Sequence, residues 1–411
     1  MSVIEATADV SDVERYKDVR RLSEALCAPL ALEDYVVQSI PEASPPKWHL
    51  AHTTWFFETF VLRRWAKDYT SCDDRYRMFF NSYYVHVSER VPQAHRGTFS
   101  RPTVEEVHRY RACVDQAMVR FIGRGLTAEQ HDVIELGIHH EQQHQELLIM
   151  DIKSHLFQAP FYPRYQTPPR LRTQPGPSAW RSMPGGLVEI GQSGELFCFD
   201  NERPRHKTYL EPFQLRDRTV TNGEWLEFIQ DGGYQDARLW LSDGWKSVET
   251  LGWDAPMYWV SQDDEWLRFS LQGLIPLDLD SPVSHVSYYE ADAFARWAKA
   301  RLPREIEWEA ASQIMPDEPG SFLEDGALDP VPVPFAMAGN VWEWTSSGYE
   351  SYPGYSAPDA ALGEYNAKFM VNQKVLRGGC CATPQTHYRH TYRNFFYPHQ
   401  RWPFTGVRLA R

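Results

Sequence analysis

A proline-rich segment divides this chain of 411 residues into two parts whose hydrophobic patterns differ. From residue 10 to residue 157, apolar residues recur at spacings of three and four, which is typical of amphipathic helices. Residues 158–182 are dense in proline and indicate an extended linker. Residues 183–411 show little periodicity and are rich in Trp, Gly, Pro and Tyr. The sequence therefore predicts a helical domain at 1–157, a linker at 158–182 and a second domain at 183–411.

The periodicity predicts four long helices in the first domain, over 13–30, 51–67, 103–123 and 127–156. Thr103 and Thr127 are suited to capping the last two, and Thr-Ala-Glu-Gln at 127–130 matches a capping box. Long helices joined by short connections favour a four-helix bundle. In the second domain we expect strand-like pieces at 186–190 and 283–286, short helices at 221–230 and 288–299, and another helix after Trp344. This pattern predicts a compact α+β domain with many ordered loops.

Composition excludes several classes of protein. Hydrophobic residues make up 42% and charged residues 24%, the balance of a globular protein. The net charge of −13 argues against a nucleic-acid binder, which needs a basic surface. No apolar run approaches the 18 residues of a membrane span, and the acidic N-terminal residues do not resemble a signal peptide. We therefore expect a cytoplasmic protein whose six cysteines, including Cys380 and Cys381, are buried free thiols.

The sharpest chemical signal is a histidine pair in the last predicted helix. His140 and His144 are four residues apart, so both imidazoles leave the same helix face and can bind one metal ion. The same residues match the His-Glu-x-x-His helix of zinc peptidases, in which Glu141 would be the general base. A third ligand is available from Lys-Trp-His-Leu-Ala-His at 47–52, as either His49 or His52.

The alternative is that these histidines bind no metal and are ordinary surface or core residues. In that case Glu141, Gln142 and Glu146 would be solvated. His139 points about 100° away from His140 on a helix and is more typical of a structural residue.

Two sets of motifs resemble one known family. Pro-Pro-Lys-Trp-His-Leu-Ala-His-Thr-Thr-Trp-Phe-Phe-Glu at 45–58 and His-His-Glu-Gln-Gln-His-Gln-Glu at 139–146 resemble the DinB-like domain of the EgtB family, the ergothioneine-biosynthetic sulfoxide synthases. Arg-Leu-Pro-Arg-Glu-Ile-Glu-Trp-Glu-Ala-Ala at 301–311, Gly-Asn-Val-Trp-Glu-Trp at 339–344, Leu-Arg-Gly-Gly at 376–379 and Phe-Thr-Gly-Val-Arg-Leu-Ala-Arg at 404–411 resemble the formylglycine-generating-enzyme (sulfatase-modifying factor) fold, which is C-type-lectin-like. Each half alone occurs in proteins of many functions, so the presence of both motif sets in this order makes the resemblance specific.

The resemblance implies an enzyme that uses non-haem iron(II) on His52, His140 and His144, with O2 as co-substrate. Such an enzyme joins the sulfur of cysteine or γ-glutamylcysteine to imidazole C2 of hercynine (Nα-trimethylhistidine). The sulfur is oxygenated in the same reaction, which gives hercynylcysteine sulfoxide. Metal identity rests on the resemblance, since a DinB-like domain could instead carry zinc for thiol transfer.

The resemblance also implies site residues. A subset of the family that resembles this chain uses a tyrosine pair in a loop of the helical domain, here Tyr83 and Tyr84, and a phenol near O2 can supply a proton or hydrogen atom. The alternative, favoured by composition alone, is that Tyr83 and Tyr84 are packing residues. Gln143 and Asn394 match positions that contact hercynine.

Chemistry adds further substrate-binding candidates. Phe395 and Phe396 could line the pocket, because aromatic faces suit a quaternary ammonium, although core packing explains them as well. The thiol substrate needs its carboxylate bound, which makes Arg96 and Arg101 candidates, with ordinary salt bridges as the alternative.

The chain departs from some relatives after Asn394. Phe396 and Gln400 stand where an acidic residue and an arginine are expected to hold a glutamyl arm, which favours free cysteine as the thiol. Cys380 and Cys381 lack the spacing of a copper site. The rival functions are 5-histidylcysteine sulfoxide synthase, selenoneine synthase, a zinc thiol transferase or hydrolase, and a non-catalytic lectin-like binding module.

Overall fold

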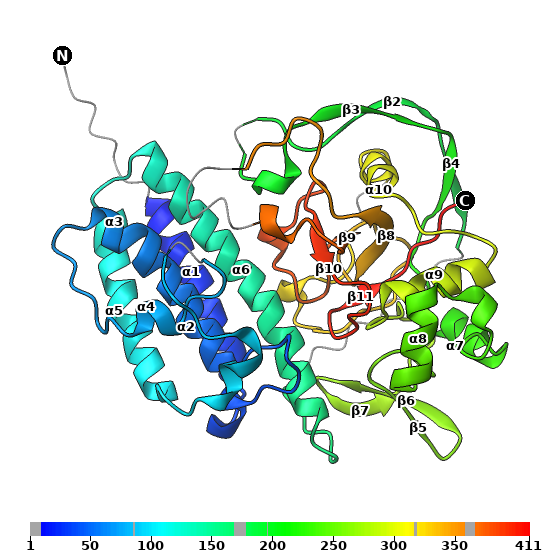
Figure 1. The fold of residues 1–411 in the computed structure, drawn as a ribbon, viewed down its shortest axis with the longest axis horizontal. Coiled ribbons are helices and arrows are strands. Elements are labelled where there is room, and N and C mark those ends of the chain that lie inside the picture. Colours follow the sequence, from blue (N-terminus) through cyan, green and yellow to red (C-terminus); the bar gives the residue numbers. More distant parts are fainter. Residues whose placement is uncertain (1–9, 85–86, 168–177, 195, 316–318, 358–365) are drawn as a thin grey trace. The chain divides into compact units, whose positions relative to one another are not determined.

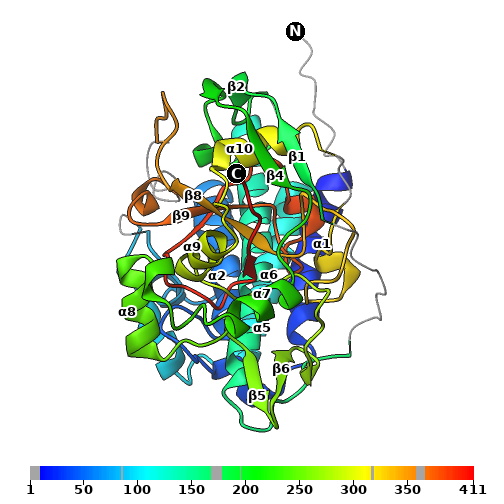
Figure 2. The same cartoon turned by 90° about the vertical axis from the view of Figure 1, so that its right-hand side faces the viewer.

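The computed structural model describes residues 10–84, 87–167, 178–194, 196–315, 319–357 and 366–411. The chain divides into two compact units, Met1–Pro160 and Phe161–Arg411. The first is built from helices and the second from helices and short strands (Figures 1 and 2). None of the described helices is both long enough and apolar enough to cross a lipid bilayer.

Four long helical segments form the N-terminal unit. They are α1 (Val10–Cys27), α2 (Pro46–Phe57), α5 (Val104–Ile122) and α6 (Ala128–Phe157). A π-helical turn, η2 (Glu58–Leu62), and the short α3 (Arg63–Trp65) prolong α2, and α4 (Tyr76–Phe79) follows. The side chains of Thr103 and Thr127 cap α5 and α6, as the sequence predicts.

Two of these helices are the interior of the unit. α2 packs against α5 and α6, and α1 also packs against α6 (Figure 1). Every residue of α2 is buried, and most residues of α6 from Val133 onward are buried as well. Because these interior faces carry histidine, glutamate and lysine, the polar groups there must find partners inside the protein.

Within its described residues, the C-terminal unit contains four small antiparallel or mixed sheets. β1 (Trp180–Met183) pairs with β4 (Phe213–Arg216), and β2 (Gly186–Ile190) pairs with β3 (His206–Leu210). β5 (Trp259–Gln262), β6 (Glu265–Ser270) and β7 (Gly273–Pro276) form a meander. The fourth sheet has the order β10 (Asn394–Phe396), β9 (Lys374–Arg377), β8 (Trp342–Gly348) and β11 (Thr405–Gly406), with β8 and β9 side by side in Figure 2.

The helices of this unit are short. They are α7 (Asn222–Gln230), α8 (Ser242–Leu251), α9 (Tyr288–Trp297) and α10 (Glu305–Ser312). The sequence analysis predicts α7 and α9 but not α8 and α10. Single 3-10 turns occur in both units: η1 (Leu32–Val36), η3 (Gln93–Thr98), η4 (Asp200–Glu202), η5 (Ala237–Leu239), η6 (Leu323–Asp325), η8 (Ala367–Phe369) and η9 (Gln385–His387).

Buried charge holds the motif segments of this unit together. Arg377 is fully buried and donates to Glu309 over 2.7 Å and to Glu305 over 3.3 Å. Arg408 and the Trp308 indole both donate to Glu343, at 2.7 and 2.6 Å. These residues come from the segments at 301–311, 339–344, 376–379 and 404–411, so the motifs encode one ion-paired core.

Two secondary-structure predictions for this unit are wrong. Residues 283–286 are a loop: His285 has a positive φ of 62°, and the backbone of this stretch bonds to three separate segments, at Val220, Met257 and Thr405. The segment expected to continue as a helix after Trp344 is instead part of β8, which pairs with β9.

The cysteines follow the prediction only in part. Cys27, Cys380 and Cys381 are buried free thiols, but Cys72 and Cys113 form a disulfide. The loop after α3 folds back onto α5 and brings these two together across 41 residues of sequence, a pairing that spacing does not reveal. The expectation that all six are free thiols is therefore wrong.

Candidate metal centre

Three histidines from two helices converge inside the N-terminal unit. His52 on α2 and His140 and His144 on α6 each offer a ring nitrogen, and these nitrogens lie within 4.8 Å of one another. The ring centroids are 4.6 to 5.0 Å apart. Within the described part of the chain this is the one cluster of His, Cys, Asp and Glu that is arranged to hold a metal ion. The histidine pair of the sequence thus gains a third histidine and no carboxylate.

Tryptophans fix the ring of His52. Trp48 stacks on it with centroids 4.5 Å apart and planes 11° apart, and Trp55 stacks at 5.5 Å and 15°. The Nδ1–H of His52 donates to the carbonyl of Phe80 over 2.6 Å, so the lone pair is on Nε2. No described residue hydrogen-bonds this Nε2 although the ring is fully buried. A buried nitrogen without a protein partner is what a metal ligand requires, so the site fits a bound ion.

Burial keeps the three imidazoles neutral. Desolvation lowers the pKa of His140 to about 3. Desolvation, together with repulsion from neighbouring histidines, lowers the pKa of His52 and of His144 well below the ordinary value. Only a neutral imidazole can donate its lone pair to a metal, so the cluster is ready to ligate near neutral pH.

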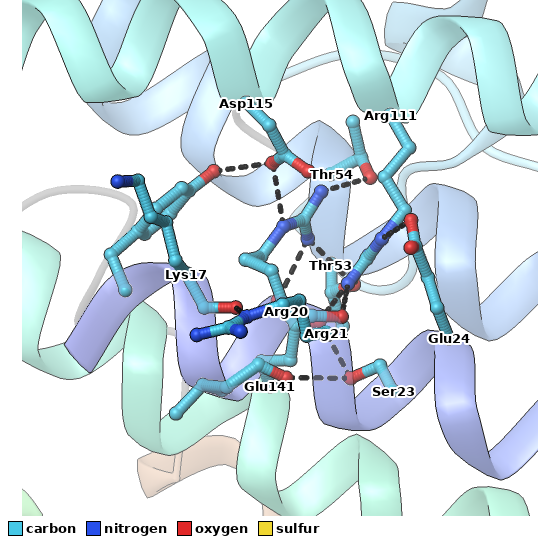
Figure 3. A network of polar contacts seen from close by, with 12 residues as sticks. Lys17, Arg20, Arg21, Ser23, Glu24, Thr53, Thr54, Arg111, Asp115 and Glu141 are labelled. Carbon is cyan, nitrogen blue, oxygen red and sulfur yellow. Dashed lines mark hydrogen bonds and ion pairs between the residues drawn. The ribbon is translucent and has the colours of Figure 1, made fainter. Parts of the chain in front are cut away.

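A buried ion cluster around Glu141 joins α6 to α1 and α5 (Figure 3). The carboxylate of Glu141 has no exposure to solvent. It accepts hydrogen bonds from Arg20 of α1 over 2.7 Å, from Arg111 of α5 over 2.5 Å and from Ser23 of α1 over 2.7 Å. Burial raises the pKa of Glu141, but Arg111 and Arg20 outweigh this effect and bring the pKa to about 2. The carboxylate is therefore a permanently charged structural group.

This arrangement disagrees with the zinc-peptidase interpretation of the His-Glu-x-x-His motif. A general base needs a free lone pair beside the metal, whereas Glu141 is consumed by two guanidinium groups. Nor are these solvated side chains: Glu141, Gln142 and Glu146 are 0%, 4% and 6% exposed. His139 is also buried, and it bonds to Glu135 rather than joining the cluster.

The tyrosine pair lies close to the tryptophan that stacks on His52. Tyr84 is fully buried, and its ring centroid is 5.6 Å from that of Trp55. Tyr83 is half-buried and stacks on Tyr84 at 4.5 Å, with the two hydroxyls 3.4 Å apart. The side chain of Asn81 fixes the loop, because it accepts from the backbone N–H of Tyr84 and donates to its carbonyl.

The two candidate arginines differ in environment. Arg96 is 6% exposed and lies over the Trp48 ring, with its guanidinium carbon 3.4 Å from the centroid. It donates to the hydroxyls of Ser44 and Ser82 and forms no ion pair with any described residue. Desolvation lowers the pKa of Arg96 to about 9. Arg101 is exposed and likewise has no ion pair within the described ranges.

The remaining candidates lie in different parts of the chain. Gln143 is partly exposed on α6, one position before His144. Asn394, Phe395 and Phe396 form β10 in the C-terminal unit, where Phe395 stacks on Tyr349 at 4.0 Å and Phe396 contacts Trp402 at 5.6 Å. Both phenylalanines therefore have packing partners in their own unit.

Sequence reasoning missed the residues that surround the histidines. Trp48 and Trp55 are four residues before and three after His52, a helical spacing that places them on the same face. Asp151 lies seven residues after His144, two turns along α6, and bonds to His49. The position of His49 also separates it from the cluster: it contacts His144 rather than joining the three nitrogens.

Comparison with known proteins places the chain in a family. The family model of the sulfatase-modifying factor enzyme 1-like domain matches residues 167–331 and 335–411. A hercynine oxygenase of Mycolicibacterium thermoresistibile is 32% identical over 90% of this chain and 88% of its own length. The chain belongs to the hercynine oxygenase family.

Two further relatives match over part of their length. A hercynine oxygenase of Mycobacterium tuberculosis is 37% identical over 54% of this chain, an alignment that spans 58% of that protein. Ergothioneine biosynthesis protein 1 of Schizosaccharomyces pombe is 28% identical over 53% of this chain and 28% of its own length. The hercynine oxygenase family is a family of enzymes that act on small molecules.

Proposed function

We propose that the chain catalyses iron(II)- and O2-dependent formation of hercynylcysteine sulfoxide in ergothioneine biosynthesis. The observation that carries this proposal is the cluster of His52, His140 and His144 in a chain of the hercynine oxygenase family. In the reaction, imidazole C2–H of hercynine and the thiol S–H are replaced by a C–S bond, and the sulfur gains one oxygen atom. Formation of the C–S bond and oxygenation of the sulfur each remove two electrons. Together they match the four-electron reduction of O2, whose second oxygen atom leaves as water.

The three histidines are the proposed iron ligands, and their neutral nitrogens leave room for further ligands on the ion. Bound iron(II) would supply the activation of O2. We further propose that the helical unit is a DinB-like domain, with a linker over 158–182 and the formylglycine-generating-enzyme-like domain at 183–411.

Arg96 is the proposed anchor of the thiol substrate's carboxylate. Among the described residues, the buried guanidinium of Arg96 hydrogen-bonds to hydroxyls and to no carboxylate, and burial lowers its pKa to about 9, so an incoming anion would stabilise it. Arg101 is proposed as a second, exposed contact. Cysteine is the favoured thiol, and γ-glutamylcysteine the alternative.

Tyr83 or Tyr84 is the proposed donor of a proton or hydrogen atom during O2 reduction. The support is that Tyr84, on which Tyr83 stacks, contacts Trp55, and Trp55 stacks on the proposed ligand His52. For hercynine we propose Gln143 and Asn394, as the family resemblance implies, and Phe395 and Phe396 as aromatic faces for its quaternary ammonium.

The test is anaerobic reconstitution with Fe(II), followed by hercynine, cysteine and air, with mass spectrometry of the products. Hercynylcysteine sulfoxide should appear with the wild type and disappear with His52→Ala. The matched control is His139→Gln, a buried histidine of α6 that bonds to Glu135 and lies outside the cluster. Histidine in place of hercynine, or γ-glutamylcysteine in place of cysteine, distinguishes the sister activities. Tightly bound zinc without O2 consumption would instead indicate a thiol transferase.

A further inference from the structure

A fourth histidine forms a buried hydrogen-bonded chain with the ligand cluster. His49 is 3% exposed and precedes His52 by three residues on α2. Its Nδ1 lies 2.8 Å from Nδ1 of His144, and its Nε2 lies 3.0 Å from Oδ2 of Asp151. Asp151 is 2% exposed, and the same Oδ2 accepts the backbone N–H of Ser44 over 2.7 Å. The order of groups is therefore carboxylate, imidazole, imidazole, metal site.

Proton counting along this chain leaves one arrangement that permits metal binding. The contact between the two Nδ1 atoms needs one hydrogen, carried by one ring or the other. If His144 carries it, its Nε2 has the lone pair that a metal needs, and Nδ1 of His49 accepts. The hydrogen of neutral His49 is then on Nε2, where Asp151 accepts it. In the opposite arrangement the hydrogen of neutral His144 is on Nε2, which cannot ligate.

A carboxylate at the end of the chain selects the first arrangement. The ionised oxygen of Asp151 only accepts, so it draws the hydrogen of His49 to Nε2 and frees Nδ1 to accept from His144. Carboxylates that hold the outer nitrogen of a ligating histidine fix its tautomer and raise its basicity. Here the carboxylate would act through one intervening imidazole.

We propose that Asp151 and His49 are positioning residues that hold the hydrogen of His144 on Nδ1 and direct its Nε2 lone pair to the metal. The inference rests on the proposed metal centre and goes beyond it, because it names the groups that tune one ligand. Removing such partners typically lowers metal affinity 10- to 100-fold, with a change in the ligand field.

Four variants separate this role from simple packing. Asp151→Asn keeps an oxygen that accepts from His49 and Ser44 but removes the charge. His49→Gln keeps a donor towards Asp151 but lacks the acceptor for His144, whereas His49→Asn keeps that acceptor and loses the reach to Asp151. His155→Gln is the matched control, since His155 is a buried histidine of α6 that bonds to Ser39 and Ser44 and not to the cluster.

The readouts are the dissociation constants for Fe(II) and Co(II), measured anaerobically against a chelator, and the visible absorption bands of the Co(II) form. We expect roughly 10- to 100-fold weaker binding and shifted bands for Asp151→Asn and His49→Gln. His49→Asn should lie between these and the wild type, and His155→Gln should match the wild type. Urea unfolding of each metal-free variant identifies the variants that fold. If His49→Gln does not fold, the isosteric Asp151→Asn alone tests the inference.

Two results would overturn the inference in distinguishable ways. If the wild type binds one ion, His144→Ala abolishes binding, and Asp151→Asn and His49→Gln keep wild-type affinity and bands, the positioning role is refuted while the metal centre stands. If the wild type itself binds no ion, the proposed metal centre fails and this inference fails with it.

Discussion

Replacing Glu141 by glutamine should destabilise the helical unit strongly. The carboxylate is shared by Arg20 and Arg111, whose side chains are 3% and 0% exposed, and the glutamine would leave both guanidinium groups without this charge. Removing one partner of a buried ion pair costs about 3–5 kcal/mol. Arg20 keeps Asp115 and Arg111 keeps Glu24, so we expect a loss near the lower end, about 3 kcal/mol.

Urea unfolding of the metal-free protein, followed by tryptophan fluorescence, measures this loss. With a urea dependence of about 2 kcal/mol per M, the midpoint should fall by roughly 1.5 M. The control is Glu14→Gln, which removes an exposed pair with Lys17 and should leave the urea midpoint nearly unchanged.

The pH dependence gives a second check on Glu141. Its pKa is lowered from 4.5 to about 2 in the folded state, so its contribution is complete above pH 4.5 and is lost as the pH falls towards 2. The difference between wild type and Glu141→Gln should shrink over that window. A midpoint for Glu141→Gln equal to that of the Glu14→Gln control would refute the account of the buried ion cluster.

Three further predictions concern the site. Tyr83→Phe or Tyr84→Phe should shift the products from sulfoxide towards cysteine sulfinate, and unchanged product ratios in both would remove the hydrogen-donor role. Arg96→Gln should raise the KM of the thiol roughly 10- to 100-fold, the loss of one charge-assisted contact, and leave the KM of hercynine nearly unchanged; equal effects on both would contradict the assignment. For His140 the folded pKa is about 3 against 6.5 for the unfolded chain, so the unfolded state binds more protons and metal-free stability should fall as the pH drops from 6.5 towards 3. His140→Asn should flatten that decline in urea titrations across this range, and a slope equal to that of the wild type would show that His140 is not held neutral.

The helical unit was predictable because its signals are local. The caps of α5 and α6 and the spacing of His140 and His144 depend on residues within one or two turns. Sequence spacing could not decide between His49 and His52 as the third ligand, because both are buried residues of α2. That choice depends on Trp48, Trp55 and the carbonyl of Phe80, which position one ring and not the other.

The second unit was less predictable because long-range contacts determine it. Residues 283–286, Val-Ser-His-Val, resemble a short strand in sequence, yet a positive φ at His285 and bonds to three separate segments make them a loop. The role of Glu141 was hidden for a similar reason. Its literal motif suggests a catalytic base, and only the packing of α1 and α5 on α6 brings Arg20 and Arg111 to it.

The most direct test of the proposed reaction is turnover under isotopically labelled O2. Fe(II)-loaded protein is mixed with hercynine and cysteine without oxygen, labelled O2 is admitted, and the product is analysed by mass spectrometry. We expect hercynylcysteine sulfoxide that carries one labelled oxygen atom, with one O2 consumed for each sulfoxide formed. Neither product nor O2 uptake is expected with His52→Ala. A sulfoxide without the label, or O2 uptake that yields only cysteine sulfinate in the wild type, would contradict the proposed function.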